Sequence, residues 1–132
     1  MTPKQFLATL DGEAKAHLSG IHDSIVKHDQ KVVPTVERMM GKEMIVYKCE
    51  GVFKYAVAGM KNYMTFHVMP MYAFPPLYKK YVAKLPKAKF QKGCINFKTA
   101  AEMPLAVVDE LMKDCAAQDY SVILEMIKKR KR

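Results

Sequence analysis

The sequence has no tryptophan, only three cysteines, and no run of about 18 apolar residues that could cross a membrane. The cysteines, Cys49, Cys94 and Cys115, are odd in number and widely separated, which argues against a disulfide framework and a CxxC metal or redox pair. The first 15 residues lack the basic region and apolar stretch of a secretion signal. We therefore expect a cytoplasmic protein in a reducing compartment, without membrane association.

Acidic residues are missing from the middle of the chain, between Glu50 and Glu102. This segment, residues 51–101, holds nine lysines, while the rest of the chain carries 13 basic and 13 acidic residues, so it accounts for the whole net charge of +9. It also holds ten of the 13 aromatic residues. Basic groups among aromatic rings suit a phosphate-bearing or aromatic ligand. The alternative is a solvated lysine face over a core rich in Tyr and Phe.

The length of 132 residues fits a single domain spanning residues 1–132. A chain of this size buries roughly two thirds of its unfolded surface. Half of the residues are hydrophobic and 27% are charged, as in ordinary globular proteins. Folding should therefore need neither metal nor disulfide.

Hydrophobic periodicity and punctuation by proline and glycine predict five helices. The first spans residues 11–28, with Asp11 as N-cap, and a short one is expected at 33–40. The others are expected between Pro75 and Pro86, from Pro104 onward, and after a cap at Asp119.

Runs of β-branched and aromatic residues predict strands at 44–48, 52–58 and 63–69, with a short edge strand at 94–97. Alternation points Phe66 and Ile95 toward the helices. The same alternation leaves a second set of side chains on an open face: Tyr63, Thr65, His67, Cys94 and Asn96. The predicted fold class is α+β, an antiparallel three- to four-stranded sheet with helices packed on one face.

The strings GVFKYAVAGMKNYMTFHVMPMY and KAKFQKGCINFKTAAEMPLAVVDELM resemble the YdhG-like family of small bacterial domains of unknown function. The similarity covers about residues 33–116 and rests on an aromatic strand pair, FHV in the next strand, and a lysine-rich segment before a proline-started helix. It implies the same sheet and helices. Since some members are described as frataxin-like iron chaperones, it also implies iron as a cofactor, without identifying ligands here.

Four histidines and one cysteine need separate consideration. Cys94, His67 and Asn96 are the residue types of a cysteine-nucleophile site, in which imidazole activates the thiol and an amide orients the ring. The alternative is that Cys94 is a small hydrophobic core residue. The helical histidines lack the i, i+4 spacing of a metal site. Glu13 and His17 share a helix face, which predicts a surface ion pair.

These observations favour a non-enzymatic binding role, in which the open face takes a small anionic ligand such as a nucleotide or phosphorylated metabolite. The iron chaperone and a protein interaction module with an acidic partner are the alternatives. Nucleic acid is disfavoured because no helix-turn-helix, RNA-recognition or zinc-finger signature occurs. A homodimer could cover the exposed sheet. We expect Tyr55, Tyr63, His67 and Asn96 on the open face to contact the ligand, and Lys61, Lys89 and Lys92 to attract it.

Overall fold

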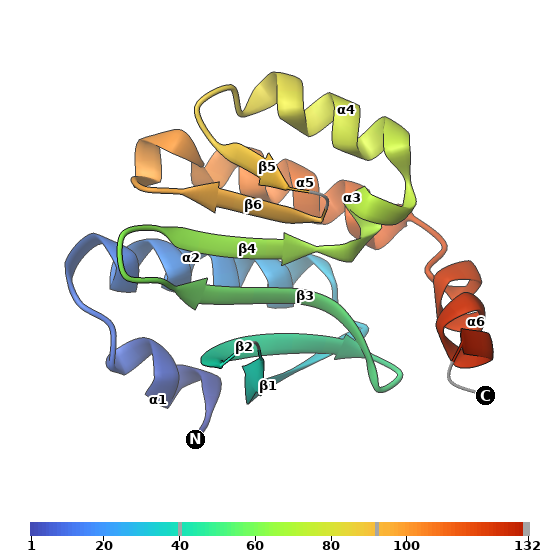
Figure 1. Cartoon of the computed structure of the whole chain (residues 1–132), viewed down its shortest axis with the longest axis horizontal. Helices are drawn as coiled ribbons and strands as arrows, with labels where there is room; N and C mark the ends of the chain where they lie inside the picture. The colour runs from blue at the N-terminus through green and yellow to red at the C-terminus, as the bar shows by residue number, and fades with distance from the viewer. Residues whose placement is uncertain (40, 92, 131–132) are drawn as a thin grey trace.

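β-branched and aromatic residues dominate the central strands, and they pair into one antiparallel sheet in the computed structural model, which describes residues 1–39, 41–91 and 93–130 (Figure 1). The strand order is β1-β2-β3-β4-β6-β5. The bounds are β1 Val32–Met39, β2 Lys42–Cys49, β3 Val52–Gly59, β4 Met64–Val68, β5 Lys89–Gln91 and β6 Cys94–Phe97. Strands β1 to β4 form a meander, and the β5–β6 hairpin extends it beyond β4.

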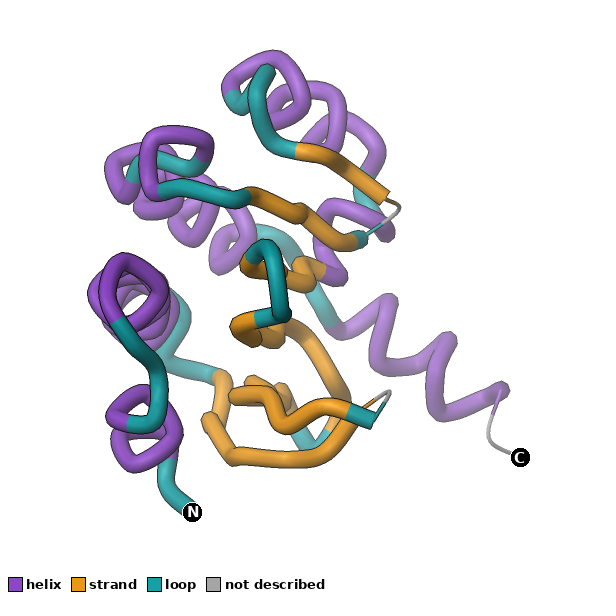
Figure 2. The backbone as a smooth tube through the Cα atoms, turned by 60° about the vertical axis from the view of Figure 1, so that its left-hand side comes forward, coloured by secondary structure: helices purple, strands orange, loops and turns teal. Residues whose placement is uncertain are grey.

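Helices α2 and α5 pack against each other and cover one face of this sheet (Figures 1 and 2). Helix α4 lies beyond the β5 edge, and α6 extends away from the end of the strands. The bounds are α1 Pro3–Ala8, α2 Gly12–His28, α3 Met69–Ala73, α4 Pro75–Lys84, α5 Leu105–Ala117 and α6 Ser121–Arg130, with a 3-10 turn η1 at Ala100–Glu102. Among these described helices, none has the length and apolar character required to cross a membrane.

The α+β class, the antiparallel sheet and the helix at residues 11–28 are confirmed. The strand number is wrong, because the sheet has six strands and the sequence predicts three or four. Residues 33–39, predicted as helix, form most of β1, since Val33, Thr35 and Val36 favour extended backbone and Pro34 is tolerated in an edge strand. Met40 lies outside the described residues. Strand β5 has only three residues, too few for a periodic signal, and it places β6 inside the sheet.

A β-bulge in β3 decides which side chains of that strand face the helices. Phe53 pairs with Lys48 and Tyr55 pairs with Tyr47, so Lys54 is an extra residue between two pairs. The Phe53 side chain therefore lies on the open face of the sheet, whereas the Tyr55 side chain belongs to the helix-side core and has no exposed surface. The prediction that Tyr55 lies on the open face is wrong, because a bulge reverses the alternation that follows it.

The bulge places a charged side chain inside the protein. Lys54 Nζ lies 2.7 Å from Asp29 Oδ2, and each side chain is 2% exposed. Tyr55 donates its hydroxyl proton to the same oxygen at 2.8 Å, and the Tyr120 ring lies under Lys54 Nζ, 4.8 Å from it. This buried network joins the α2–β1 connection to β3 and to the residue that precedes α6, so it links segments distant in sequence.

His17 is buried in the helix-side core, and the predicted surface ion pair with Glu13 is wrong. Only 4% of His17 is exposed, and its ring packs edge-on against Phe97 with the centroids 5.4 Å apart. Glu13 instead accepts a hydrogen bond from the Ala100 amide, 2.7 Å away. Burial lowers the pKa of His17, and a backbone hydrogen bond at Met103 and the Glu13 charge oppose this shift.

We expect acid to destabilise the fold partly through His17. Its folded pKa is lowered, so the unfolded chain binds the proton more readily, and the free energy of unfolding falls as pH decreases below about 6.5. His17→Leu should therefore lose less stability than wild type between about pH 7 and about pH 5.5. Urea unfolding at both pH values measures this difference. Equal losses would exclude His17 as a source of acid sensitivity; His22 and His67 add to it, because burial lowers their pKa values too.

Candidate functional site

The sheet face opposite α2 and α5, called the open face, changes character from one edge to the other. On β2 and β3 it is apolar, with Met44, Val46, Ala56 and Ala58 buried beneath Met39, Phe53 and Met60. On β4, β6 and β5 it is polar, because strand alternation and pairing bring six side chains to the same side. These are Thr65, His67, Cys94, Asn96, Lys89 and Gln91.

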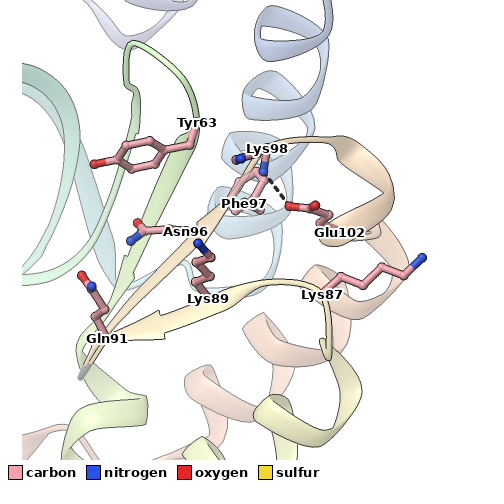
Figure 3. A pocket seen from close by; sticks show the side chains of 8 residues that line it. All are labelled: Tyr63, Lys87, Lys89, Gln91, Asn96, Phe97, Lys98 and Glu102. Carbon is pink, nitrogen blue, oxygen red and sulfur yellow. Dashed lines mark hydrogen bonds between the residues drawn. The ribbon is translucent and has the colours of Figure 1, made fainter.

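A cavity of about 390 Å³ opens at the polar end of this face. Its lining comes from the β3–β4 loop, the residues before β5, the β5–β6 hairpin and η1. The lining residues are Tyr63, Lys87, Lys89, Gln91, Asn96, Phe97, Lys98 and Glu102. Figure 3 shows the side chains of Tyr63, Lys89, Gln91 and Asn96 around one hollow, with Lys87 extending away from it. We call this hollow the lysine cavity.

Several lysines of the basic segment are neutralised by carboxylates from elsewhere in the chain. Lys54 pairs with Asp29; Lys80 lies 3.1 Å from Glu110 and 2.6 Å from Asp114, and Lys84 lies 3.0 Å from Glu110. The charge of the segment is therefore less available than the sequence indicates. The positive charge that can attract a ligand is therefore carried by the lysines outside these pairs.

Within the described part of the chain, five lysines of the segment form no ion pair: Lys61, Lys79, Lys87, Lys89 and Lys98. Three of these line the lysine cavity. The one acidic lining residue, Glu102, accepts a hydrogen bond from the Lys98 backbone amide at 2.7 Å. The lining thus carries three positive charges against one negative charge, which favours an anion.

Only some of the predicted ligand-binding residues lie together in the structure. Tyr63, Lys89 and Asn96 come together in the lysine cavity, and His67 lies on the same face without lining it. Lys61 is exposed in the β3–β4 loop and does not line the cavity. Tyr55 faces the helices, as described above, and Lys92 lies outside the described residues.

Sequence reasoning missed five lining residues: Lys87, Gln91, Phe97, Lys98 and Glu102. Gln91 was missed because the predicted sheet did not include strand β5. Once Lys89–Gln91 is recognised as a strand paired with β6, alternation places Lys89 and Gln91 beside Asn96 and Cys94. Lys98 and Glu102 depend on the turn after β6, for which the sequence contained no comparable signal.

The His67 and Cys94 side chains are in contact. They are directly opposite one another on β4 and β6, with Cys94 Sγ 2.8 Å from His67 Nδ1. The Phe53 ring packs edge-on against the imidazole, with centroids 6.1 Å apart. Burial lowers the pKa of His67 and raises the pKa of Cys94, so both groups are uncharged near neutral pH. In the tautomer with the ring proton on Nε2, Nδ1 accepts a hydrogen bond from the thiol.

A metal site would need several donor groups close together. Among the described residues, no group of three or more His, Cys, Asp or Glu side chains is arranged to hold an ion. We therefore assign no iron ligand in this part of the chain. The iron chaperone stays a prediction of the family resemblance.

No protein-family model, curated protein or solved structure matches this chain. The similarity to the YdhG-like family stays a prediction. Functional inference consequently depends on the lysine cavity and the adjacent His67–Cys94 pair.

Proposed function

We propose that the lysine cavity binds a small anionic ligand, in the class of nucleotides or phosphorylated metabolites, and that this is a binding function without catalysis. The supporting observation is that Lys89 and Lys98 line one hollow, with Lys87 at its rim, and that in the described part of the chain none of the three ammonium groups has a carboxylate partner. Lysine ammonium groups that lack an internal counter-charge attract phosphate oxygens.

The remaining lining supports an aromatic or polar ligand portion. Tyr63 is 38% exposed, which leaves part of its ring free for stacking against a base. Asn96 and Gln91 supply amide donors and acceptors beside Lys89, and they would orient a sugar or base by hydrogen bonds. The cavity volume of about 390 Å³ lies at the lower end of the range of small-molecule sites.

An amide NMR titration with metal-free ATP tests the proposal. We expect saturable shifts at Tyr63, Lys89, Asn96 and Lys98, with unchanged signals along α2 on the covered face. Binding should weaken when sodium chloride is raised from about 20 mM to about 200 mM, because the Debye length falls below the cavity dimensions.

Adenosine is the matched ligand without phosphates, and it should bind much more weakly than ATP. Absence of saturable shifts with ATP, or equal shifts with adenosine and no salt dependence, would overturn the proposal of an anion site. Shifts confined to residues outside the cavity would overturn its location.

A further inference from the structure

In the His67–Cys94 pair, an imidazole nitrogen that can act as a base is in contact with the thiol. We propose that Cys94 is a reactive thiol that passes its proton to His67 Nδ1 and exchanges with disulfides of small anionic thiols held in the lysine cavity. The reactivity follows from the pair itself, whereas the preference for anionic disulfides rests on the proposed function of the cavity.

Proton transfer within the pair requires no rearrangement. The Sγ–Nδ1 distance of 2.8 Å is within hydrogen-bond reach, and the neutral ring has a free electron pair on Nδ1 when its proton is on Nε2. Contacts with Phe53 on one side and Cys94 on the other hold the ring in this orientation. Burial favours the uncharged pair, and thiolate forms as the minor thiolate–imidazolium form when His67 takes the thiol proton.

Cys94 is the cysteine that a reagent can reach. It is half-buried on the open face, whereas Cys49 is 5% exposed and Cys115 is fully buried, both in the helix-side core. Burial raises the pKa of both Cys94 and Cys115, to about 12 for Cys115, and Cys94 is in contact with an imidazole nitrogen that can take its proton. Any fast thiol reaction of the folded protein is therefore assigned to Cys94.

The exchange balances without a further oxidant. The thiol proton moves from Sγ to His67 Nδ1, and the Sγ electron pair attacks one sulfur of the incoming disulfide. A bond forms between Sγ and that sulfur while the disulfide bond of the reagent breaks. The other half leaves as a thiolate and takes a proton from the imidazolium or from water. Cys94 is oxidised to a mixed disulfide, and the leaving thiol is the reduced product.

Cys94 does not line the lysine cavity, but its strand neighbours do. Gln91, a lining residue, is directly opposite Cys94, and Lys89 is directly opposite Asn96 two residues farther along β6. Same-face neighbours along a strand are about 7 Å apart. A carboxylate held at Lys89 would therefore leave the disulfide of an aromatic thiol within reach of Cys94.

The test compares two reagents on the full chain: the dianion 5,5′-dithiobis(2-nitrobenzoate) and the neutral 4,4′-dithiodipyridine. Second-order rate constants are measured from pH 6 to pH 9 for wild type, His67→Gln, Lys89→Gln and Cys94→Ser. Cys94→Ser should lose the fast reaction with both reagents. If it keeps that reaction, Cys94 is not the reactive thiol.

Proton transfer to His67 predicts a specific pH profile. Between the two pKa values of the pair the thiolate–imidazolium population is independent of pH, so the wild-type rate should be nearly flat. In His67→Gln the rate should fall about tenfold from pH 8 to pH 7, as for an isolated thiol. Parallel profiles of wild type and His67→Gln would overturn the role of His67, because a merely structural effect shifts the rate without changing its pH dependence.

The reagent comparison separates the two parts of the proposal. Lys89→Gln should slow the dianionic reagent by about tenfold and leave the neutral reagent unchanged. If both reagents respond alike to Lys89→Gln while the His67 effect persists, the preference of Cys94 for anionic disulfides is overturned and the base-assisted thiol stands, whereas the ATP titration separately decides the proposed function of the cavity.

Discussion

Replacing Asp29 with alanine is expected to lower the free energy of unfolding by about 3–5 kcal/mol, because it leaves a buried charge without its partner. Lys54 Nζ and the Tyr55 hydroxyl both lose their acceptor, and Lys54 is only 2% exposed. Urea denaturation of wild type and Asp29→Ala at pH 7 measures the loss, provided that both unfold in two states.

The double variant Asp29→Ala with Lys54→Met is the control for this prediction. Removing both charges should recover much of the loss, since an apolar pair of similar volume avoids the cost of desolvation. Lys48→Met, which breaks a surface contact of 2.8 Å with Glu37, should change stability far less. A small effect of Asp29→Ala, or no recovery in the double variant, would show that the buried charge is not what the fold depends on.

Lys89→Glu is expected to weaken ATP binding by at least about tenfold, because it replaces a charge-assisted hydrogen bond with repulsion. Lys89 is the lysine that projects beside Asn96 and Gln91 in the cavity (Figure 3). Isothermal titration at low salt gives the dissociation constants of wild type and variant.

Lys113→Glu is the matched control for net charge. Lys113 is exposed on α5, in the helical layer on the covered side of the sheet, so its reversal changes the total charge equally without altering the cavity. Equal weakening by both variants would mean that ATP responds to the overall field of the protein and that the lysine cavity is not its site.

The sequence by itself determined the features that depend on near neighbours. The helix at 11–28 and the strands β2 to β4 follow from periodicities of 3.6 and 2 over several residues. The same alternation correctly assigned His67, Cys94 and Asn96 to the open face. Their proximity required one further fact, that β4 and β6 pair with His67 opposite Cys94.

Only the tertiary structure decided the remaining features. Pairing with β2 makes residues 32–39 a strand, and the bulge at Lys54 turns Tyr55 inward and buries a lysine against Asp29. Carboxylates on α5 neutralise Lys80 and Lys84, and three of the five described lysines of the segment that form no ion pair line one cavity. These outcomes arise from contacts between segments far apart in the chain, whose free energies of pairing and burial exceed local propensity and leave no local pattern in the sequence.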